Sequence, residues 1–131
     1  MIVNIKKSKA IGTIAAPPSK SMAHRALICA ALSGGSVVRN IEYSNDISAT
    51  LDCLTALGAK IEKSDNVITL GGLNPFGAKE ATLDCRESGS TLRFMIPLAF
   101  LSGSKITFVG SERLFARNLT IYQEISEQNG I

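Results

Sequence analysis

The feature that most constrains this chain is an internal repeat. Residues 19–34 (SKSMAHRALICAALSG) align with residues 88–103 (SGSTLRFMIPLAFLSG) at an offset of 69 positions, with 6 of 16 pairs identical. Both stretches start with Ser-x-Ser, continue as an apolar run and end at Ser-Gly. Such self-similarity indicates a structural unit that is used twice. We therefore expect two helices, each capped by a serine and ended by a glycine.

The segments after each expected helix also correspond. Residues 36–41 and 104–109 are rich in β-branched residues and predict strands. The further expected elements are a helix over 46–57 with Asp46 as its N-cap, a hairpin of 59–63 and 66–70 around Ser64-Asp65, a loop over 71–79, a strand over 81–85 and a helix over 118–128. Pro97 lies inside the second repeated helix and is expected to kink or interrupt it.

This order of elements predicts an α/β fold. The first repeat covers about residues 15–80, and the second covers about residues 81–131. In the second copy the chain stops at Ile131, where the hairpin should begin. A helix without its sheet partners leaves an apolar face uncovered, so we expect a partial domain that is truncated in the second repeat.

Three expected helix starts carry groups that suit an anion. At the first, Lys20, Ser21 and Arg25 lie within one turn, after two prolines that hold the chain extended. Ser19 or Ser21 can cap this helix, and the free N–H groups of a helix start favour a negative charge. At the second start, Gly89 would let the backbone approach a ligand closely. Taken alone, each of these segments also fits an ordinary capped helix with solvated basic residues.

The third start, in residues 110–117, carries Arg113 and Arg117, which share a face if this turn is helical. Equivalent strand-to-helix junctions tend to lie at one edge of a sheet, where ligands bind. We therefore expect one pocket with few nearby carboxylates, surrounded by Lys20, Arg25, Arg93 and Arg117. Four cations suit a substrate with several negative charges. His24 is expected to be structural or solvated.

Composition excludes several other classes of protein. The net charge is only +3, and the 14 Lys and Arg form no basic block with interleaved aromatics, which argues against nucleic acid. No apolar run approaches the roughly 18 residues of a membrane span. Cys29, Cys53 and Cys85 match neither a disulfide framework nor a zinc site, so we expect apolar core positions in a reducing compartment. The sequence predicts a cytoplasmic protein.

The three helix starts together resemble the signatures of a known enzyme family. Residues 16–27 (APPSKSMAHRAL) resemble the P-[GP]-S-K-S-x-x-x-R-A-L signature of 5-enolpyruvylshikimate-3-phosphate synthases. Residues 84–94 (DCRESGSTLRF) resemble D-C-G-x-S-G-[ST]-T-x-R, and 110–118 (GSERLFARN) resemble G-x-x-R-x-x-x-R-P. Arg86 and Asn118 depart from these patterns, standing where glycine and proline are usual, and Glu87 stands where other members have Asn.

The resemblance implies an enzyme of two domains, each built from three β-α-β-α-β-β units, that acts as a monomer without metal or cofactor. Such enzymes transfer the enolpyruvyl group of phosphoenolpyruvate to the 5-hydroxyl of shikimate 3-phosphate. By resemblance, Lys20 contacts both substrates, Ser21 and Arg25 contact shikimate 3-phosphate, and Gly89 and Arg117 contact phosphoenolpyruvate, with Arg93 and Arg113 as further candidates. The acid/base groups are expected beyond Ile131, so the chain alone should be inactive.

Two other functions stay open. The related UDP-N-acetylglucosamine enolpyruvyl transferase carries a lysine-asparagine pair where this chain has Lys20-Ser21, and a reactive loop cysteine that residues 110–117 lack. A non-catalytic anion-binding module could use the same helix starts.

Overall fold

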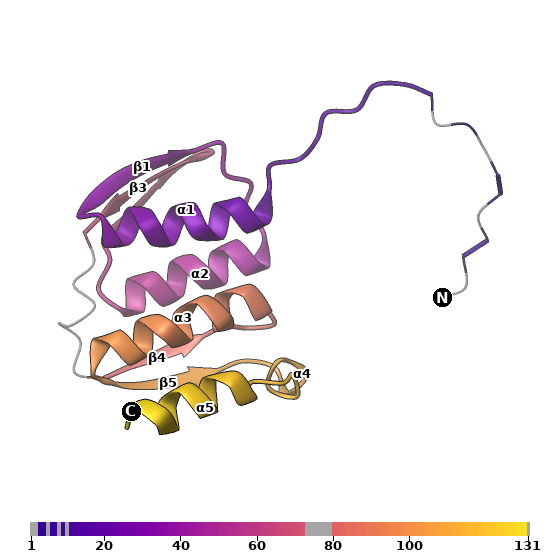
Figure 1. Ribbon diagram of the computed structural model, residues 1–131. Coiled ribbons are helices and arrows are strands. Elements are labelled where there is room, and N and C mark those ends of the chain that lie inside the picture. The colour runs from indigo at the N-terminus through magenta and orange to yellow at the C-terminus, as the bar shows by residue number, and fades with distance from the viewer. Residues whose placement is uncertain (1–2, 5, 8, 10, 73–79, 131) are drawn as a thin grey trace.

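The computed structural model describes residues 3–4, 6–7, 9, 11–72 and 80–130. In order, the elements are α1 (Lys20–Leu32), β1 (Gly35–Arg39), α2 (Asn45–Ala56), β2 (Ile61–Ser64), β3 (Val67–Gly71), β4 (Glu80–Asp84), α3 (Gly89–Ser102), β5 (Lys105–Val109), α4 (Glu112–Phe115) and α5 (Thr120–Asn129) (Figure 1). The α/β fold predicted from the sequence is therefore confirmed. The predicted loop over 71–79 lies largely outside the described residues.

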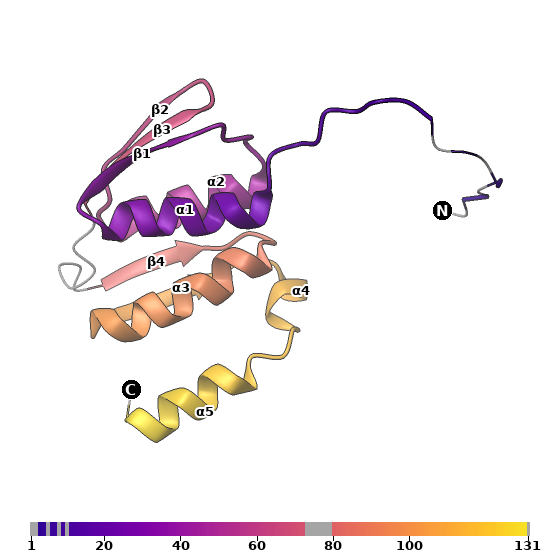
Figure 2. The same cartoon turned by 45° about the horizontal axis from the view of Figure 1, so that its top comes forward.

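Two small sheets lie on opposite sides of a group of helices. The first sheet is antiparallel, in the order β1-β3-β2, and the second pairs β4 with β5 in parallel. Helix α1 packs on β1 and β3, whereas α2 packs on β4 and α3 on β5. Figure 2 shows α1 and α2 between the antiparallel sheet and β4, with α5 at the opposite end of the molecule. The helices and sheets thus form layers around one core.

Serine side chains cap the starts of the three long central helices. Ser19, Ser44 and Ser88 have extended backbones, and each accepts a hydrogen bond from the backbone N–H three residues later. This geometry satisfies one of the N–H groups that a helix start leaves unpaired. The predicted cap Asp46 is wrong, because Ser44 takes this position and Asp46 lies in the first turn.

The predicted hairpin is present, but its turn is shifted by one residue. The turn occupies Asp65 and Asn66, and Ser64 is the last residue of β2. Asp65 has a φ of 46°, in the left-handed region that a tight two-residue hairpin requires. Ile68 and Leu70 on β3 are buried, which places this strand's inner face on the core.

Pro97 does not interrupt α3. The helix runs from Gly89 to Ser102 with Pro97 inside it, so of the two predicted outcomes the interruption is wrong and the kink stays a prediction. Proline has no N–H to donate to the carbonyl four residues earlier, here that of Arg93. The hydroxyl of Tyr122 on α5 donates to this carbonyl instead, at 3.3 Å. A side chain from another helix thus supplies a hydrogen bond where proline cannot.

The core is built mainly from aliphatic side chains of α1, α2, α3 and β3. Cys53 and Cys85 are buried within it, as predicted, whereas Cys29 is exposed and the prediction for it is wrong. Cys29 lies on the outer side of α1, between the buried Ile28 and Ala30. In the part of the chain that the structure describes, no helix combines the length and apolar character needed to cross a membrane.

Candidate functional site

The starts of the central helices lie at one end of the molecule. Strands β1, β4 and β5 all run towards this end, where the chain turns into α2, α3 and α4, and α1 starts there too (Figure 1). The Lys20–Asp46 ion pair and the hydrogen bond from the Thr91 hydroxyl to the Asp46 carbonyl join the first turns of α1, α2 and α3, so these three starts are neighbours. Free backbone N–H groups and the positive ends of several helix dipoles therefore gather in one region, which favours a bound anion.

The start of α1 brings together the first three predicted site residues. The Lys20 ammonium lies 3.0 Å from a carboxylate oxygen of Asp46, so the expectation of few carboxylates near the cations does not hold for Lys20. Arg25 donates to the Ser21 carbonyl at 2.9 Å, as expected for residues four apart on a helix. Its guanidinium lies 5.2 Å from the centre of the Phe94 ring on α3, within range of a cation–π contact.

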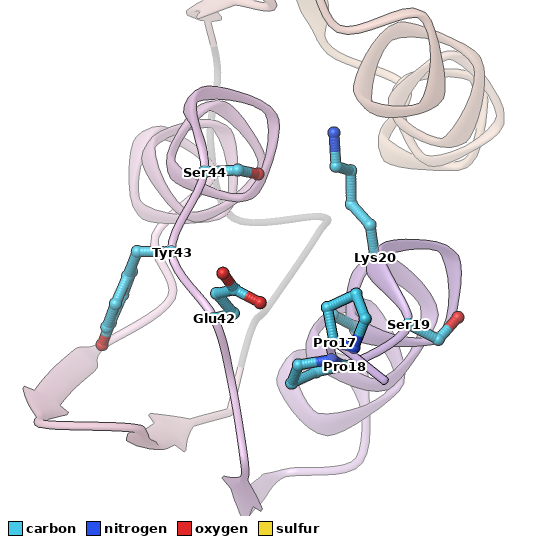
Figure 3. Close-up of a pocket in the computed structure, with 8 residues that line it drawn as sticks. Pro17, Pro18, Ser19, Lys20, Glu42, Tyr43 and Ser44 are labelled. Atoms are coloured by element: carbon cyan, nitrogen blue, oxygen red, sulfur yellow. The ribbon is translucent and has the colours of Figure 1, made fainter. Parts of the chain in front are cut away.

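A pocket of about 300 Å³ lies next to this helix start. Figure 3 shows Pro17, Pro18, Ser19 and Lys20 on one side of it and Glu42, Tyr43 and Ser44, which precede α2, on the other. Of the predicted site residues only Lys20 lines this pocket, and its ammonium points away towards the helices. Arg25, Gly89, Arg93 and Arg117 do not line it, so this pocket does not unite the four predicted cations.

At the start of α3, Gly89 and Arg117 are in contact. A Cβ atom placed on Gly89 would collide with Nη1 of the Arg117 guanidinium. Glycine therefore provides the space into which this arginine reaches. The two residues lie 28 positions apart, and the fold brings together the pair that the resemblance assigns to phosphoenolpyruvate. Arg93, one turn into α3, is exposed.

The structure shows why glycine is usual at position 86 and how an arginine is accommodated there. Its φ is 51°, a left-handed conformation that glycine adopts without cost. The backbone N–H donates to a side-chain oxygen of Asp84 at 2.8 Å, which helps hold this turn. The guanidinium donates to Asp52 at 2.6 Å, so a carboxylate on α2 pairs with the added charge. Arg86 therefore adds little net positive charge to the site.

The third segment differs from the sequence prediction. Helix α4 ends at Phe115, so Arg117 lies beyond it and does not share a helix face with Arg113. The loop is held to the turn before α3, because Ser111 donates its N–H to the Arg86 carbonyl at 2.8 Å. At Asn118, where proline is usual, the side chain accepts a hydrogen bond from the Thr120 N–H at 2.8 Å and so serves the start of α5.

The charges at this end are unevenly paired. Among the described residues, the ion pairs here are Lys20–Asp46 and Arg86–Asp52, and neither includes Arg25, Arg93, Arg113 or Arg117. Exposed guanidinium groups beside helix starts can bind carboxylate and phosphate oxygens in pairs. Within the described ranges, no group of three or more His, Cys, Asp or Glu side chains could hold a metal ion. The cations outside these two ion pairs thus suit an anionic ligand.

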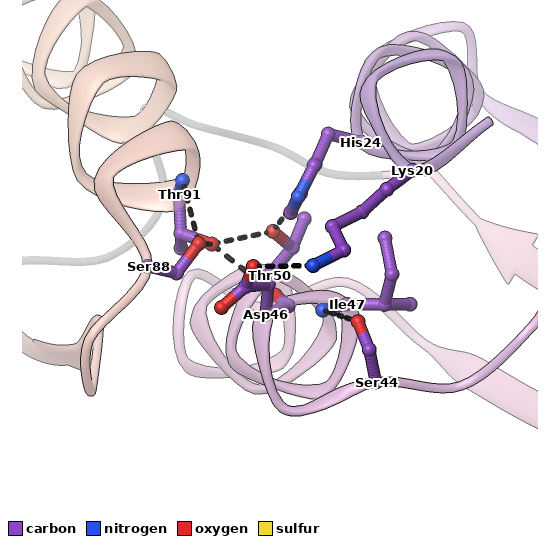
Figure 4. A network of polar contacts seen from close by, with 8 residues as sticks. All are labelled: Lys20, His24, Ser44, Asp46, Ile47, Thr50, Ser88 and Thr91. Carbon is purple, nitrogen blue, oxygen red and sulfur yellow. Dashed lines mark hydrogen bonds and ion pairs between the residues drawn. The ribbon is translucent and has the colours of Figure 1, made fainter. Parts of the chain in front are cut away.

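The sequence did not predict a buried chain of polar groups behind these helix starts. It runs from His24 on α1 through Thr50 on α2 to Thr91 and the capping Ser88 on α3 (Figure 4). His24 is only 1% exposed, so of the two expected states it is structural and not solvated. Burial lowers the pKa of His24 below its usual value, Asp46 opposes this, and Lys20 and Arg25 add to it. The only sequence signal was a pair of threonines within expected helices.

A second buried pair, Cys53 and Cys85, lies between α2 and the end of β4. The Cys53 thiol donates to the Asp84 carbonyl at 3.5 Å. A hydrogen bond with Cys85, together with burial, raises the pKa of Cys53 far above its usual value. Cys53 therefore stays a neutral thiol, as expected of a residue that serves packing.

Comparisons with known proteins agree with this geometry. A model of the EPSP synthase (3-phosphoshikimate 1-carboxyvinyltransferase) family matches residues 5–130. The 3-phosphoshikimate 1-carboxyvinyltransferase of Clostridium kluyveri is 45% identical over 130 residues, which cover 98% of this chain and 30% of that protein. That of Clostridium beijerinckii is 46% identical over 137 residues, with 98% and 32% covered. The EPSP synthase from Acinetobacter baumannii superimposes with a TM-score of 0.75 at 25% identity, over 91% of this chain and 28% of that one. The chain thus spans less than a third of the length of these relatives.

Proposed function

The chain belongs to the EPSP synthase family, and from this premise we propose that its parent protein transfers the enolpyruvyl group of phosphoenolpyruvate to the 5-hydroxyl of shikimate 3-phosphate. Phosphate is released in the reaction. The observation that carries the proposal is the family match over residues 5–130, within which all three helix starts fall in order. The gathering of those starts at one end of the molecule supports it.

In this proposal the chain supplies part of the substrate-binding surface. Lys20, Ser21 and Arg25 bind shikimate 3-phosphate, and Lys20, Gly89, Arg93 and Arg117 bind phosphoenolpyruvate. The contact between Gly89 and Arg117 supports the second group, because it holds a guanidinium against the free N–H groups at the start of α3. Lys20 would exchange its bond to Asp46 for a substrate oxygen. Cations held in place in this way stabilise the charge that develops during transfer.

We propose the wider organisation on the same basis. Residues 1–131 form part of an N-terminal domain, with a first repeat over about 15–80 and an incomplete second repeat over about 81–131. The serine-capped helices α1 and α3, each followed by a strand, support this division. The parent is proposed to be a cytoplasmic monomer that needs no cofactor.

A binding experiment tests the assignment of residues. Isothermal titration of the purified chain with shikimate 3-phosphate should detect specific binding, and Arg25→Ala should weaken the affinity about ten- to hundredfold, since charge-assisted hydrogen bonds contribute about 1.5–3 kcal/mol each. Lys63→Ala removes a positive charge from the exposed side of β2 and serves as the control. Equal binding of shikimate 3-phosphate and inorganic phosphate would favour a generic anion-binding module instead.

An activity assay tests the proposal that the chain is only part of the enzyme. With both substrates present, the 131-residue chain should release no phosphate above the buffer rate, because it spans less than a third of its relatives. Detectable release by the purified chain would overturn this part of the proposal.

A further inference from the structure

Four buried polar side chains from three helices form one hydrogen-bonded chain. His24 Nδ1 lies 2.7 Å from the Thr50 hydroxyl, Thr50 lies 2.8 Å from the Thr91 hydroxyl, and Thr91 lies 2.7 Å from the Ser88 hydroxyl. All four residues are at most 2% exposed. Figure 4 shows the chain crossing from α1 over α2 to the start of α3. It therefore links the two helix starts that carry the proposed substrate contacts.

The chemistry of the groups fixes the direction of these hydrogen bonds. The Thr91 hydroxyl lies 3.3 Å from the backbone carbonyl of Asp46, and a carbonyl can only accept. Thr91 therefore uses its single proton as a donor, chiefly to the Ser88 hydroxyl at 2.7 Å, with the Asp46 carbonyl as a second and longer acceptor. It follows that Thr91 accepts from the Thr50 hydroxyl.

The direction of the Thr50–Thr91 bond also determines the role of the His24 imidazole. Because Thr50 donates to Thr91, its own lone pair accepts from Nδ1–H of His24. His24 thus carries a proton on Nδ1, and burial, which lowers its pKa, favours the neutral form in which Nε2 is unprotonated. The Nε2 atom is buried and has no hydrogen-bond partner among the described residues. In this tautomer Nε2 carries a lone pair, and a buried unpaired acceptor is tolerated more often than a buried unpaired N–H.

An apolar side chain would fill this place at lower cost, because burying an imidazole carries a desolvation penalty. What the imidazole adds is a directional bond across the α1–α2 interface, which continues through Thr91 to the cap of α3. We propose that His24 is a positioning residue that holds Ser88 and Gly89 in register with Ser21 and Arg25. The ligand part of this inference rests on the proposed function, whereas the hydrogen-bond chain does not.

Such a device is needed because the two halves of the site lie on different helices. The Ser88–Thr91 turn follows the first turn of α1 by 69 residues in the sequence. Binding groups must be held within about 0.5 Å of their productive positions, and hydrogen bonds from buried neighbours are the usual means. Across α1 and α3, the Phe94 ring lies 6.4 Å from the His24 ring, centroid to centroid, and 5.2 Å from the Arg25 guanidinium carbon. Hydrogen bonds are more directional than ring contacts, so the chain adds a defined orientation of α3 to the apolar packing of the core.

The burial of His24 makes the stability of the chain depend on pH. The charged groups that act on His24 are Asp46 on α2 and Lys20 and Arg25 on α1, while α3 presents the uncharged Ser88, Thr91 and Phe94. The pKa of His24 is lower in the folded chain than the ordinary 6.5, so the unfolded chain binds the proton more readily. The contribution of neutral His24 to the free energy of unfolding is therefore fully present above pH 6.5. It is lost as the pH falls from 6.5 through the lower pKa of the folded chain.

The first test is the tautomer of His24, which needs no variant. A long-range ¹H–¹⁵N spectrum of the labelled chain at pH 7.5 should show His24 with Nδ1 protonated and Nε2 unprotonated. On acidification below pH 6.5, the Thr91 amide signal should shift together with the imidazole signals. A neutral imidazole with its proton on Nε2 would reverse the direction of the hydrogen bonds and overturn the inference. A Thr91 amide signal that does not shift as His24 titrates would also overturn it.

The second test breaks the chain in the middle. Thr50→Val keeps the shape of the side chain but removes its hydroxyl, and it should speed hydrogen exchange of the Thr91 amide about five- to tenfold, the effect of losing one hydrogen bond. Thr55→Val is the matched control, because Thr55 is an exposed threonine of α2 whose hydroxyl donates to the Leu51 carbonyl of its own helix. If the Thr91 amide exchanged at the same rate in the two variants, His24 would contribute only packing and the proposed positioning role would be wrong.

Titration with shikimate 3-phosphate separates this inference from the proposed function. If both hold, Thr50→Val weakens binding several-fold more than Thr55→Val does. If the chain binds no ligand while the tautomer and the exchange effect are as expected, the proposed function fails and the positioning of α3 by His24 stands. Binding that is equal in both variants contradicts the positioning role.

Discussion

The segments 20–71 and 80–129 use the same local devices in different surroundings. Each contains a serine-capped helix, then a strand, then a second helix. Yet α2 buries six residues whereas α5 buries none, because α2 packs against α1, α3 and β4. Strand β1 pairs with β3, while β5 pairs only with β4 among the described strands. Local sequence thus forms the elements, and their neighbours decide how firmly each is held.

The same comparison locates the weak and strong parts of the candidate site. Lys20, Ser21 and Arg25 stand on α1, which is packed against α2 and the antiparallel sheet. Arg113 and Arg117 stand on or beyond the four-residue α4, which buries only Leu114. The first group is held by a packed helix, whereas Arg117 depends on a short loop and on the space over Gly89.

The largest expected difference is in the cost of truncating the second helices. Leu54 of α2 is fully buried, so Leu54→Ala should lower the free energy of unfolding by about 2–5 kcal/mol. Ile125 of α5 is 40% exposed, and Ile125→Ala should cost less than about 1 kcal/mol. Urea denaturation of both variants measures the difference. Similar costs would mean that α5 is packed as firmly as α2.

The next effect concerns the space over Gly89. Gly89→Ala should leave the fold intact, because the end of a flexible arginine can move aside, but it should weaken phosphoenolpyruvate binding about tenfold by displacing the Arg117 guanidinium. Calorimetric titration measures the loss. In an Arg117→Ala background the same substitution should have no further effect, and an undiminished effect there would show that Gly89 acts independently of Arg117.

A smaller effect is expected where α5 meets α3. Tyr122→Phe removes the hydroxyl that donates to the Arg93 carbonyl and should destabilise the chain by about 0.5–1.5 kcal/mol. Pro97→Ala restores the backbone N–H, so the Tyr122→Phe substitution should cost less in that background. Thermal unfolding of the unsubstituted chain, the two single variants and the double variant completes the double-mutant cycle. Strict additivity would mean that the tyrosine does not compensate for the proline.

The smallest effect should come from Arg86 and Asp52. Both side chains are about half exposed, so their ion pair should contribute about 0–1 kcal/mol. Asp52→Asn should therefore leave the unfolding midpoint nearly unchanged at 0.15 M salt. It should, however, strengthen phosphate binding slightly, because the charge of Arg86 is no longer paired. If Asp52→Asn instead weakened phosphate binding, the ion pair with Asp52 would not be the reason that Arg86 adds little charge to the site.

Much of the fold followed from short-range signals. Ser19 and Ser88, the glycine at position 103 and the β-branched strands were visible in the sequence because caps and strands depend on nearby residues. The residues that were misjudged depend on distant partners. The interruption at Pro97 was predicted without knowledge of Tyr122, and the exposure of Cys29 depends on which side of α1 meets the core.

The candidate site shows the same division. The positions of Lys20, Ser21 and Arg25 on one helix turn were predictable from spacing alone. Three features were not: the contact of Arg117 with Gly89, the pairing of Lys20 with Asp46 and the links from His24 to Thr50. Each joins elements that are far apart in the sequence, and no local pattern encodes such a contact.

The central claim is that the starts of α1 and α3 form one anion site, and amide chemical shifts test it most directly. During titration of the ¹⁵N-labelled chain with shikimate 3-phosphate, the amides of Ser21 and Arg25 on α1 and of Gly89 and Ser90 on α3 should shift together with one dissociation constant. Shifts confined to one helix start, or two different dissociation constants, would contradict a single site.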